Sequence, residues 1–391
     1  MLSRFSCRSI STAFLATRRA TTSFTDKIEI ASPIEGKEPK ICRLDEAFSR
    51  IKSGDNIFIH GIAATPTPLL KGLCEHVRAN NLKDIRLHHL IIAGEAPWTA
   101  PDLKDRMRSN SLFTGESLRK AVNEAMMNKN MPRTFGDSVI HSSHIDVLVE
   151  DNSFQLHELL ADEIHEDEHK IGKLIAENLV ENGSTLQMGI GAVPDAALDA
   201  LKNHKDLGIH TEMFSDLRPG KLVVSFVYGS KKLYDYLNNN PAVEFGDVQW
   251  VNDPAIIRQN PKVVAINSAV EIDLTGQVVA DSIGKRFLSG FGGQVDFIRG
   301  ASIGNDGEGK PIIALQSMSK KGQSKIVPYL SQGAGVVTTR SHVHYVVTEN
   351  GIAQLWGRNM RQRAYELIMI SHPSQREYLE KEAFERLKVG L

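Results

Sequence analysis

Two stretches of this chain follow the same order of predicted elements, and this repetition constrains the fold more than any other feature. In each, a polar turn leads into a short apolar strand, a glycine-containing loop, a helix and a second apolar strand. The strands of the first copy are expected at 57–59 and 85–87, and those of the second at 185–188 and 207–209. Short apolar strands that alternate with helices are typical of parallel βαβ units. The sequence therefore predicts an α/β protein with two Rossmann-like, open parallel-sheet domains of related topology.

The same alternation continues to the end of the chain. Further strands are predicted at 222–227, 263–266, 312–315, 335–338 and 345–347, and further helices at 231–237, 361–370 and 374–387. An acidic, polar stretch over 150–170 lies between the two copies of the repeat, and 391 residues are enough for two cores. We place the domain boundary in that stretch, which predicts an N-terminal domain over 26–160 and a C-terminal domain over 161–391.

The composition excludes several classes of protein. A formal net charge of -1 gives no reason to expect a nucleic-acid partner. No uninterrupted apolar run is long enough to span a bilayer. The three cysteines have no metal-like or disulfide-framework spacing, which favours a reducing intracellular compartment. His342 and His344 alternate in a possible strand, but no third ligand lies nearby in sequence, so we expect no metal site.

The first 25 residues differ from the rest of the chain. They contain Arg4, Arg8, Arg18 and Arg19 and many hydroxyl side chains, and the first acidic residue is Asp26. A basic, Ser-rich segment without acids is typical of a mitochondrial transit peptide, and a disordered basic tail is the alternative. We therefore expect residues 1–25 to be a transit peptide and the protein to be in the mitochondrial matrix.

A glycine turn follows the predicted strand at 185–188. It consists of Gly189, Ile190, Gly191, Ala192 and Val193. A turn of this kind exposes backbone N–H groups and places a helix N-terminus where anions bind. It lacks the third glycine of the dinucleotide fingerprint, and many such turns only form a tight corner between strand and helix.

Glu212 lies just after the apolar strand expected at 207–209. Its neighbours His210, Thr211, Ser215 and Asp216 make a polar cluster at the end of that strand. Ligands of open α/β sheets bind at the carboxyl ends of strands, which favours a functional acid over a helix cap or a surface charge.

Two further segments contain residues suited to ligand binding or acid–base chemistry. The segment 289–296 has three glycines within four positions, which permits close approach of the backbone to a ligand. An ordinary loop is the alternative. Glu271 and Asp273 share one face of a predicted strand and can act either as an acid–base pair or as structural acids.

These motifs together resemble the acetyl-CoA hydrolase/transferase family, which includes 4-hydroxybutyrate CoA-transferases. The matching stretches are 58–68, 131–138, 189–197, 209–216, 265–277, 290–300 and 333–351, and the resemblance covers nearly everything after the leader. It implies the class I CoA-transferase fold, Glu212 as a glutamyl nucleophile, and CoA contacts at Gly189–Val193, Asn267, Gly290 and Lys310. It also implies a homodimer, with coenzyme A and acyl-CoA as substrates and no tightly bound cofactor.

The function implied is transfer of CoA between acetyl-CoA or a related acyl-CoA and a short carboxylate such as 4-hydroxybutyrate, butyrate or succinate. The transfer would pass through a glutamyl-CoA thioester on Glu212. An acetyl-CoA hydrolase on the same site is the first alternative. A catalytically weak CoA-binding variant is the second, and the glycine turn alone leaves a nicotinamide dehydrogenase as a third.

The chain departs from the family pattern at two places. Only Ala125–Lys129 joins two stretches that are separated in the family by a large block with residues expected to line the acyl site. A second segment is missing directly after Asp216, where the chain passes at once to Leu217. We expect these two junctions to expose part of the core or to open the site to water.

Overall fold

The computed structural model describes residues 32–89, 92–111, 124–127, 130–159, 164–189, 191–214 and 222–388. The predicted transit peptide, Ile190 of the glycine turn, and Ser215 and Asp216 of the polar cluster lie outside the described residues. No helix of the described part is both long and apolar enough to cross a membrane.

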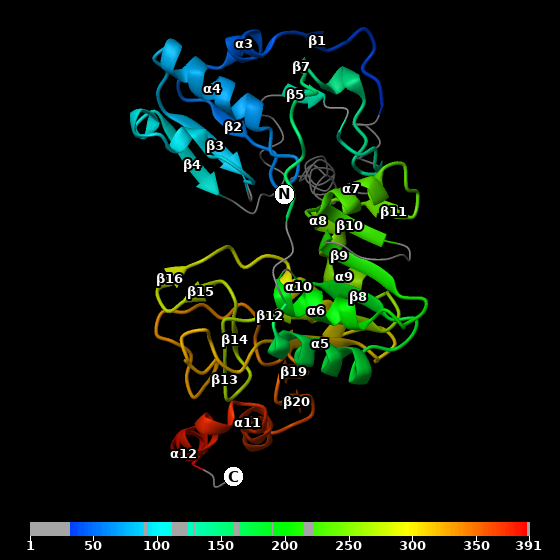
Figure 1. Ribbon diagram of the computed structural model, residues 1–391, viewed down its shortest axis with the longest axis vertical. Helices are drawn as coiled ribbons and strands as arrows, with labels where there is room; N and C mark the ends of the chain where they lie inside the picture. The colour runs from blue at the N-terminus through cyan, green and yellow to red at the C-terminus, as the bar shows by residue number, and fades with distance from the viewer. Residues whose placement is uncertain are drawn as a thin grey trace, which may run out of the picture.

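The N-terminal part forms the upper portion of the molecule in Figure 1 and contains two small parallel sheets. One consists of β2 (Asn56–Phe58), β3 (Ile85–His89) and β4 (Met107–Ser111), and the other of β1 (Lys40–Ile41), β7 (Val147–Glu150) and β5 (Glu124–Met127). Helix α4 (Thr67–Ala79) connects β2 to β3, and the short helix α3 (Leu44–Ala47) packs beside it. Leu70, Leu73 and Val77 recur at helical spacing, and α4 buries them against the first sheet.

A nine-stranded sheet forms the C-terminal part. In spatial order its strands are β20 (Gly351–Gln354), β19 (Tyr345–Thr348), β17 (Lys310–Ala314), β12 (Val263–Ser268), β8 (Thr185–Met188), β9 (Gly208–Phe214), β10 (Leu222–Val227), β11 (Val243–Phe245) and β6 (Phe135–Gly136). All neighbours pair in parallel except β20, which is antiparallel to β19.

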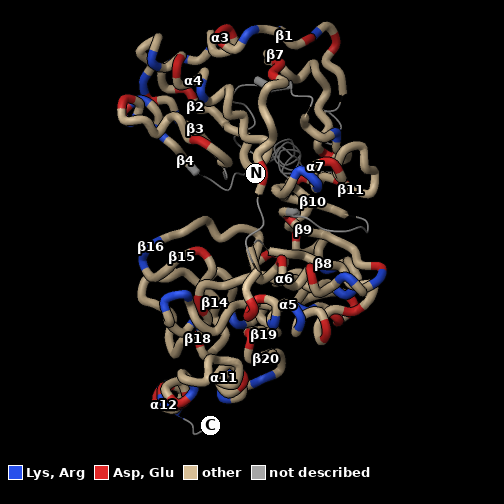
Figure 2. Tube along the Cα trace, in the orientation of Figure 1, with Lys and Arg blue, Asp and Glu red and all other residues tan. Residues whose placement is uncertain are grey.

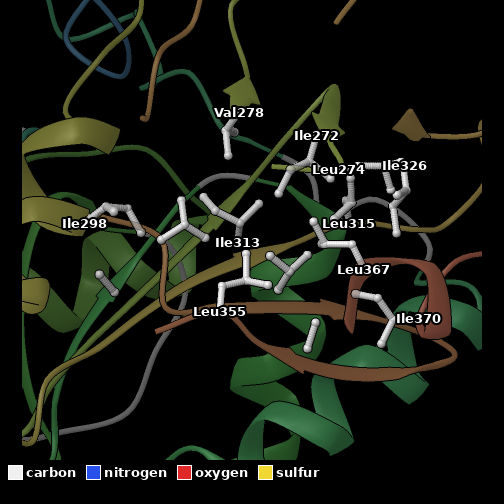
Figure 3. Close-up of a cluster of buried hydrophobic side chains, with 14 of the residues drawn as sticks. Ile272, Leu274, Val278, Ile298, Ile313, Leu315, Ile326, Leu355, Leu367 and Ile370 are labelled. Carbon is white, nitrogen blue, oxygen red and sulfur yellow. The ribbon is translucent and has the colours of Figure 1, made fainter. Parts of the chain in front are cut away.

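Helices cover both faces of this sheet. One face carries α5 (Glu166–Asn178) and α6 (Ala192–Ala200), whose apolar residues pack on Leu186, Val264 and Ile312. The other face carries α8 (Val248–Val251), α9 (Pro254–Ile257), α10 (Gln294–Ser302), α11 (Met360–Met369) and α12 (Arg376–Leu387). Figure 3 shows part of this second core, where Ile313 and Leu315 meet Leu355 and Leu367. The neighbouring Val263 and Val264 thus face opposite cores, as pleated strands require.

The strand order reverses direction at β8. From β8 the chain adds β9, β10 and β11 on one side, and α7 (Lys231–Leu237) connects β10 to β11. It then returns to add β12, β17 and β19 on the other side of β8. The adjacent strands β8 and β12 therefore lead into loops that run in opposite directions. This is the topological switch point of a doubly wound sheet, where ligands bind beyond the carboxyl ends of the strands.

Several predicted elements differ from the structure in their bounds. The strand with Glu212 extends to Phe214, so Glu212 lies inside β9 rather than after it. The strand predicted at 335–338 does not form, because Thr338 makes only an isolated bridge to Val278. The last helix begins at Arg376, because Pro373–Gln375 forms a separate 3-10 turn.

Three short strands and one hairpin complete the second part. The strands are β13 (Glu271–Asp273), β14 (Val278–Val279) and β18 (Ile326–Val327), and the hairpin is β15 (Ser282–Ile283) with β16 (Arg286–Phe287). Strand β6 comes from residues before the predicted boundary at 160, yet it pairs with β11 of the large sheet. The chain thus crosses between the two parts more than once.

Candidate active site

Glu212 lies near the carboxyl end of β9. The strand register places it beside Ser225 of β10, since Thr211 pairs with Val224 and Met213 pairs with Phe226. Its neighbour on the same strand face, His210, is buried, and the imidazole Nε2 lies 2.7 Å from the carbonyl oxygen of Val251. The polar residues of this segment are therefore part of the folded core, and they fix the strand that carries Glu212.

Two groups donate hydrogen bonds to the Glu212 carboxylate. One is the side-chain amide of Asn252 and the other is the backbone N–H of Gly293, the residue directly before α10. Burial raises the pKa of Glu212 above its ordinary value, and these two hydrogen bonds act in the opposite direction. The position at a helix N-terminus favours a negative charge there.

The hydrogen bond from Gly293 to Glu212 requires a glycine at position 293. A Cβ atom at Gly293 would lie 2.3 Å from Oε2 of Glu212 and 2.6 Å from Nδ2 of Asn252. Such distances are far inside van der Waals contact, so any larger residue would displace the carboxylate. The sequence predicts that the glycine segment 289–296 lets backbone approach a ligand, and in the structure its backbone approaches the candidate nucleophile.

Two buried polar atoms around Glu212 have no hydrogen-bond partner among the described residues. They are Oδ1 of Asn252 and Oγ of Ser225. Buried polar atoms are normally paired, so unpaired ones next to a carboxylate indicate groups that are available to a bound molecule.

A second carboxylate lies close to Glu212. Asp296, in the first turn of α10, has its pKa raised to about 6, chiefly by burial and then by the negative charges of Glu212 and Asp253. A carboxyl group whose pKa is raised by burial and by a neighbouring carboxylate occurs often at catalytic sites.

Two of the predicted CoA contacts meet at the switch point of the sheet. Gly189 follows β8, and Asn267 lies near the end of β12, where its side-chain amide donates a 2.7 Å hydrogen bond to Oε1 of the buried Gln187. The N–H of Gly189 donates to the carbonyl of Ile266 at 2.8 Å and is thus used by the sheet. Gly191 has φ 119°, a conformation that favours glycine, and the predicted contacts at 192 and 193 begin α6 just after it.

Gly290 lies in the exposed loop that leads into α10, four positions before Gln294, the first residue of that helix. Its carbonyl oxygen accepts a 2.8 Å hydrogen bond from the hydroxyl of Ser289. Gly290 therefore belongs to the same loop as Gly293, the residue whose N–H binds Glu212.

Lys310 is the one predicted contact that the structure places away from the others. It begins β17 and therefore lies at the amino end of the parallel strands, opposite to the edge where Glu212 and Asn267 lie. Its Nζ forms an ion pair with Glu181 at 2.7 Å, and Lys262 binds the same carboxylate. The two lysines lower the pKa of Glu181 to about 2. Lys310 thus belongs to a structural ion-pair cluster rather than to the Glu212 site.

The remaining candidates of the sequence have structural partners. Glu271 accepts hydrogen bonds from the N–H and hydroxyl of Ser331, and Asp273 pairs with Arg386 at 3.0 Å. His342 accepts from Arg299, while His344 packs on a tryptophan ring and has its pKa lowered to about 4, chiefly by burial. No group of metal-ligating side chains occurs among the described residues.

An open cavity of about 820 Å³ lies on the N-terminal part, away from Glu212. Ile41, Phe48 and His76 are among its lining residues, and none of the predicted site residues lines it. Its size does not make it the candidate site, because Glu212 and Asp296 lie on β9 and α10 instead.

Sequence reasoning missed Asn252, Ser225 and Asp296 as neighbours of Glu212. Asn252 precedes Asp253 and Pro254, a pattern that predicts only a helix start. Asp296 does fall within the glycine segment, but nothing in its spacing indicates a contact with an acid on a distant strand. These contacts arise from long-range packing, which the order of residues does not reveal.

Comparison with known proteins identifies the family and the fold. Residues 35–127 match the acetyl-CoA hydrolase/transferase N-terminal domain, and residues 229–383 match the C-terminal domain of the same family. The solved 4-hydroxybutyrate CoA-transferase of Porphyromonas gingivalis superposes with a TM-score of 0.76 at 34% identity, covering 89% of this chain and 98% of that one. The predicted fold class is thereby confirmed.

Two curated relatives match over most of their length. The succinyl-CoA:acetate/propanoyl-CoA:succinate CoA transferase of Fasciola hepatica is 47% identical over 455 residues, covering 96% of this chain and 95% of the relative. The 4-hydroxybutyrate coenzyme A transferase of Clostridium kluyveri is 38% identical over 421 residues, covering 88% and 97%.

The first of these alignments is longer than the chain itself. It runs over 455 positions against 391 residues, so at least 64 positions of the relative, the difference between the two lengths, have no counterpart here. This agrees with the two junctions at which the sequence departs from the family pattern. With both family domains matched and the relatives spanned almost end to end, the chain belongs to the acetyl-CoA hydrolase/transferase family.

Proposed function

We propose that this enzyme transfers CoA between acetyl-CoA, or a related short acyl-CoA, and a short-chain carboxylate, with Glu212 as the nucleophile. The observation that carries the proposal is the position of Glu212. It is a half-buried carboxylate at the carboxyl edge of the sheet, held by Asn252 and by the N–H of Gly293. No other described carboxylate combines that edge of the sheet with two donors and orphaned polar neighbours.

The chemistry follows from these groups. The ionised Glu212 carboxylate attacks the acyl-CoA thioester, which releases CoA thiolate and leaves an acyl-glutamyl anhydride. The thiolate then attacks the glutamyl carbonyl, so that the first carboxylic acid departs and a glutamyl-CoA thioester remains. A second carboxylate reverses these steps and leaves as the new acyl-CoA. Each intermediate is a mixed anhydride or a thioester, so the activation of the original thioester is retained on the enzyme and no ATP is consumed.

The two hydrogen-bond donors at Glu212 act both before and during the reaction. In the free enzyme they hold the carboxylate in one orientation. When the glutamyl carbonyl is attacked, negative charge develops on its oxygen, and donors already aimed at that oxygen stabilise the charge. Burial makes the nucleophile less solvated, and the raised pKa of Glu212 expresses the same environment.

A direct test is the mass of the Glu212 peptide. After incubation with acetyl-CoA and quenching at low pH, the peptide should carry the mass of CoA less one water. Glu212→Gln, which keeps the size of the side chain, should carry no adduct and lose nearly all turnover. The exposed Glu244 of β11 offers a matched control, and Glu244→Gln should react like the wild type. Absence of the adduct, together with unchanged turnover in Glu212→Gln, would overturn the proposal.

The same site supports acetyl-CoA hydrolysis as the second candidate, because water can take the place of the second carboxylate in the attack on the thioester. Release of free CoA, measured with and without succinate, butyrate or 4-hydroxybutyrate, separates the two activities. A transferase needs the acid, and a hydrolase does not. CoA binding without turnover of any kind would instead identify a catalytically weak CoA-binding variant.

Two further properties belong to the proposal. The acid-free basic segment 1–25 supports import into the mitochondrial matrix, which a fusion of these residues to a fluorescent protein would test. A homodimer is proposed from the family resemblance, and sedimentation of the purified chain measures it.

A further inference from the structure

The hairpin of β15 and β16 belongs to the C-terminal part and leads into the loop before α10. Its turn consists of Gly284, with φ 54°, and Lys285. The N–H groups of Leu288 and Ser289 donate to the carbonyl of Asp281 at 2.7 and 3.3 Å, and so close the base of the hairpin. From there the chain continues directly to Gly293, whose N–H binds Glu212.

The surface of this hairpin is unusual for a folded domain. Phe287 is 70% exposed and Ile283 is 59% exposed. Lys285 and Arg286 are exposed at the tip, which is blue in Figure 2, and neither forms an ion pair with any acid of the described chain. The segment 282–293 contains no acidic residue. Exposed aromatic surface beside unpaired cations indicates a binding surface.

The hairpin is held in a defined position. The N–H of Gly335 donates to Oγ of Ser282 at 3.3 Å. Gly333 packs so closely that a Cβ atom there would lie 2.7 Å from Cγ of Lys285. The loop with both glycines is anchored in turn where Ser331 binds Glu271. Glu271 thus has a structural role, and the cations at the tip are presented from a fixed support.

The hairpin also lies at a suitable distance from the reacting carboxylate. Gly293 follows Phe287 by six positions, and a fully extended chain covers at most about 3.5 Å per residue, so the two lie within roughly 20 Å of each other. The pantetheine arm of CoA separates its thiol from its nucleotide by a distance of the same order. A thioester at Glu212 can therefore have its nucleotide at the hairpin.

We propose that the β15–β16 hairpin binds the phosphorylated nucleotide of the CoA substrate, which rests on the function proposed for Glu212. Lys285 and Arg286 bind its phosphates, since guanidinium and ammonium groups pair with phosphate oxygens. Phe287 supplies a flat apolar face for the adenine ring. The nucleotide is the part of the substrates that combines several negative charges with an aromatic ring, so it complements this surface in both respects.

The experiment compares acetyl-CoA with acetyl-pantetheine, which lacks the nucleotide. In the double variant Lys285→Glu/Arg286→Glu, KM for acetyl-CoA should rise at least about tenfold, as expected for the loss of charge-assisted phosphate contacts. KM for acetyl-pantetheine and kcat for both substrates should stay within about twofold. Lys320→Glu/Lys321→Glu reverses two exposed cations outside the hairpin and should leave all of these constants near the wild-type values.

An equal change in KM for both substrates, or no change for acetyl-CoA, would overturn the proposal. A change of oligomeric state in Phe287→Ser without a change in KM would overturn it as well, and would assign the hairpin to contact between copies of the chain. Isothermal titration of each variant with CoA and, separately, with pantetheine compares the two binding affinities without turnover. Failure of the nucleophile proposal, seen as a missing Glu212 adduct, is therefore distinguishable from failure of this one.

Discussion

At the scale of single residues, Glu212 is controlled by opposing effects. Burial raises its pKa, while Asn252 and the N–H of Gly293 stabilise its charged form. Its charged form is thus held by two donors yet poorly solvated, which is a suitable state for a nucleophile. The arrangement depends on one small residue, because Gly293 allows its backbone N–H to reach the carboxylate.

We expect Gly293→Ala to fold and to lose activity. The φ of Gly293 is -83°, which any residue adopts, so the backbone is not strained. The new methyl group would occupy the space 2.3 Å from Oε2 of Glu212 and push the carboxylate aside. A displacement on the order of 1 Å costs about 10²-fold in rate, which steady-state kinetics would measure.

Gly208→Ala on the same strand as Glu212 is the control, because its Cβ would lie 3.5 Å from the nearest atom, an ordinary contact. It should keep its turnover and thermal midpoint. A Gly293→Ala enzyme with normal kcat would show that the carboxylate does not need this contact.

The raised pKa of Asp296 predicts a pH dependence of stability. Its pKa of about 6 lies above the ordinary 3.8, so the folded state binds this proton more tightly than the unfolded state does. The resulting stabilisation is fully present below pH 3.8 and is lost as the pH rises through about 6. Asp296→Asn removes the titration, so it should become more stable than the wild type, by about 1 kcal/mol after screening by solvent, as the pH passes this window.

Denaturant titrations of both proteins at pH 4 to 8 measure that difference. A constant difference across the range would contradict the prediction.

At the scale of elements, α5 and α6 pack closely against each other on one face of the large sheet. Gly172 of α5 faces the backbone of α6, where a Cβ would lie 2.4 Å from the carbonyl oxygen of Ala196. Gly172→Ala should therefore force the two helices apart and lower the free energy of unfolding by about 1–3 kcal/mol, which chemical denaturation would measure.

Gly72 of α4 is the matched helical control. A Cβ there would lie 2.8 Å from Cε2 of the buried Phe48 and 3.1 Å from Cγ of Leu44, so it would meet side-chain atoms rather than backbone. Gly72→Ala should cost less than Gly172→Ala, because side chains yield more easily than backbone and the gain in helix propensity of about 1 kcal/mol offsets part of the crowding. Equal effects of the two substitutions would mean that the close approach of α5 and α6 does not limit stability.

How well the sequence predicts these elements depends on what their residues contact. The strand at 222–227 and the helix at 231–237 have the predicted bounds in the structure, since the strand is rich in β-branched and aromatic residues and the helix places Leu233, Tyr234 and Leu237 on one buried face. The prediction for β9 is too short because His210 and Thr211 look like loop residues. In the fold they are buried, and their polar atoms bind the carbonyls of Val251 and Met188.

At the scale of the whole molecule, the site depends on the order of the strands. Glu212, Gly189 and Asn267 are far apart in sequence, and the reversal at β8 brings the ends of their strands to one edge of the sheet. The sequence pattern and the family resemblance together predict such an edge. They could not predict that Lys310 would lie on the opposite one, because the position of a residue along its strand becomes clear only once the strand's bounds are known.

Strand β6 has a practical consequence for dividing the molecule. Phe135 and Gly136 protect the outer side of β11, and Gly136, with φ 89°, fits against the carbonyl of Phe245. A fragment that began at residue 161 would leave β11 with unpaired backbone groups, a template on which strands of other molecules can assemble. A fragment that began near residue 130 would keep β6 paired with β11 and so would not expose this edge. The shortest C-terminal fragment that resists aggregation therefore starts well before the acidic stretch at 150–170.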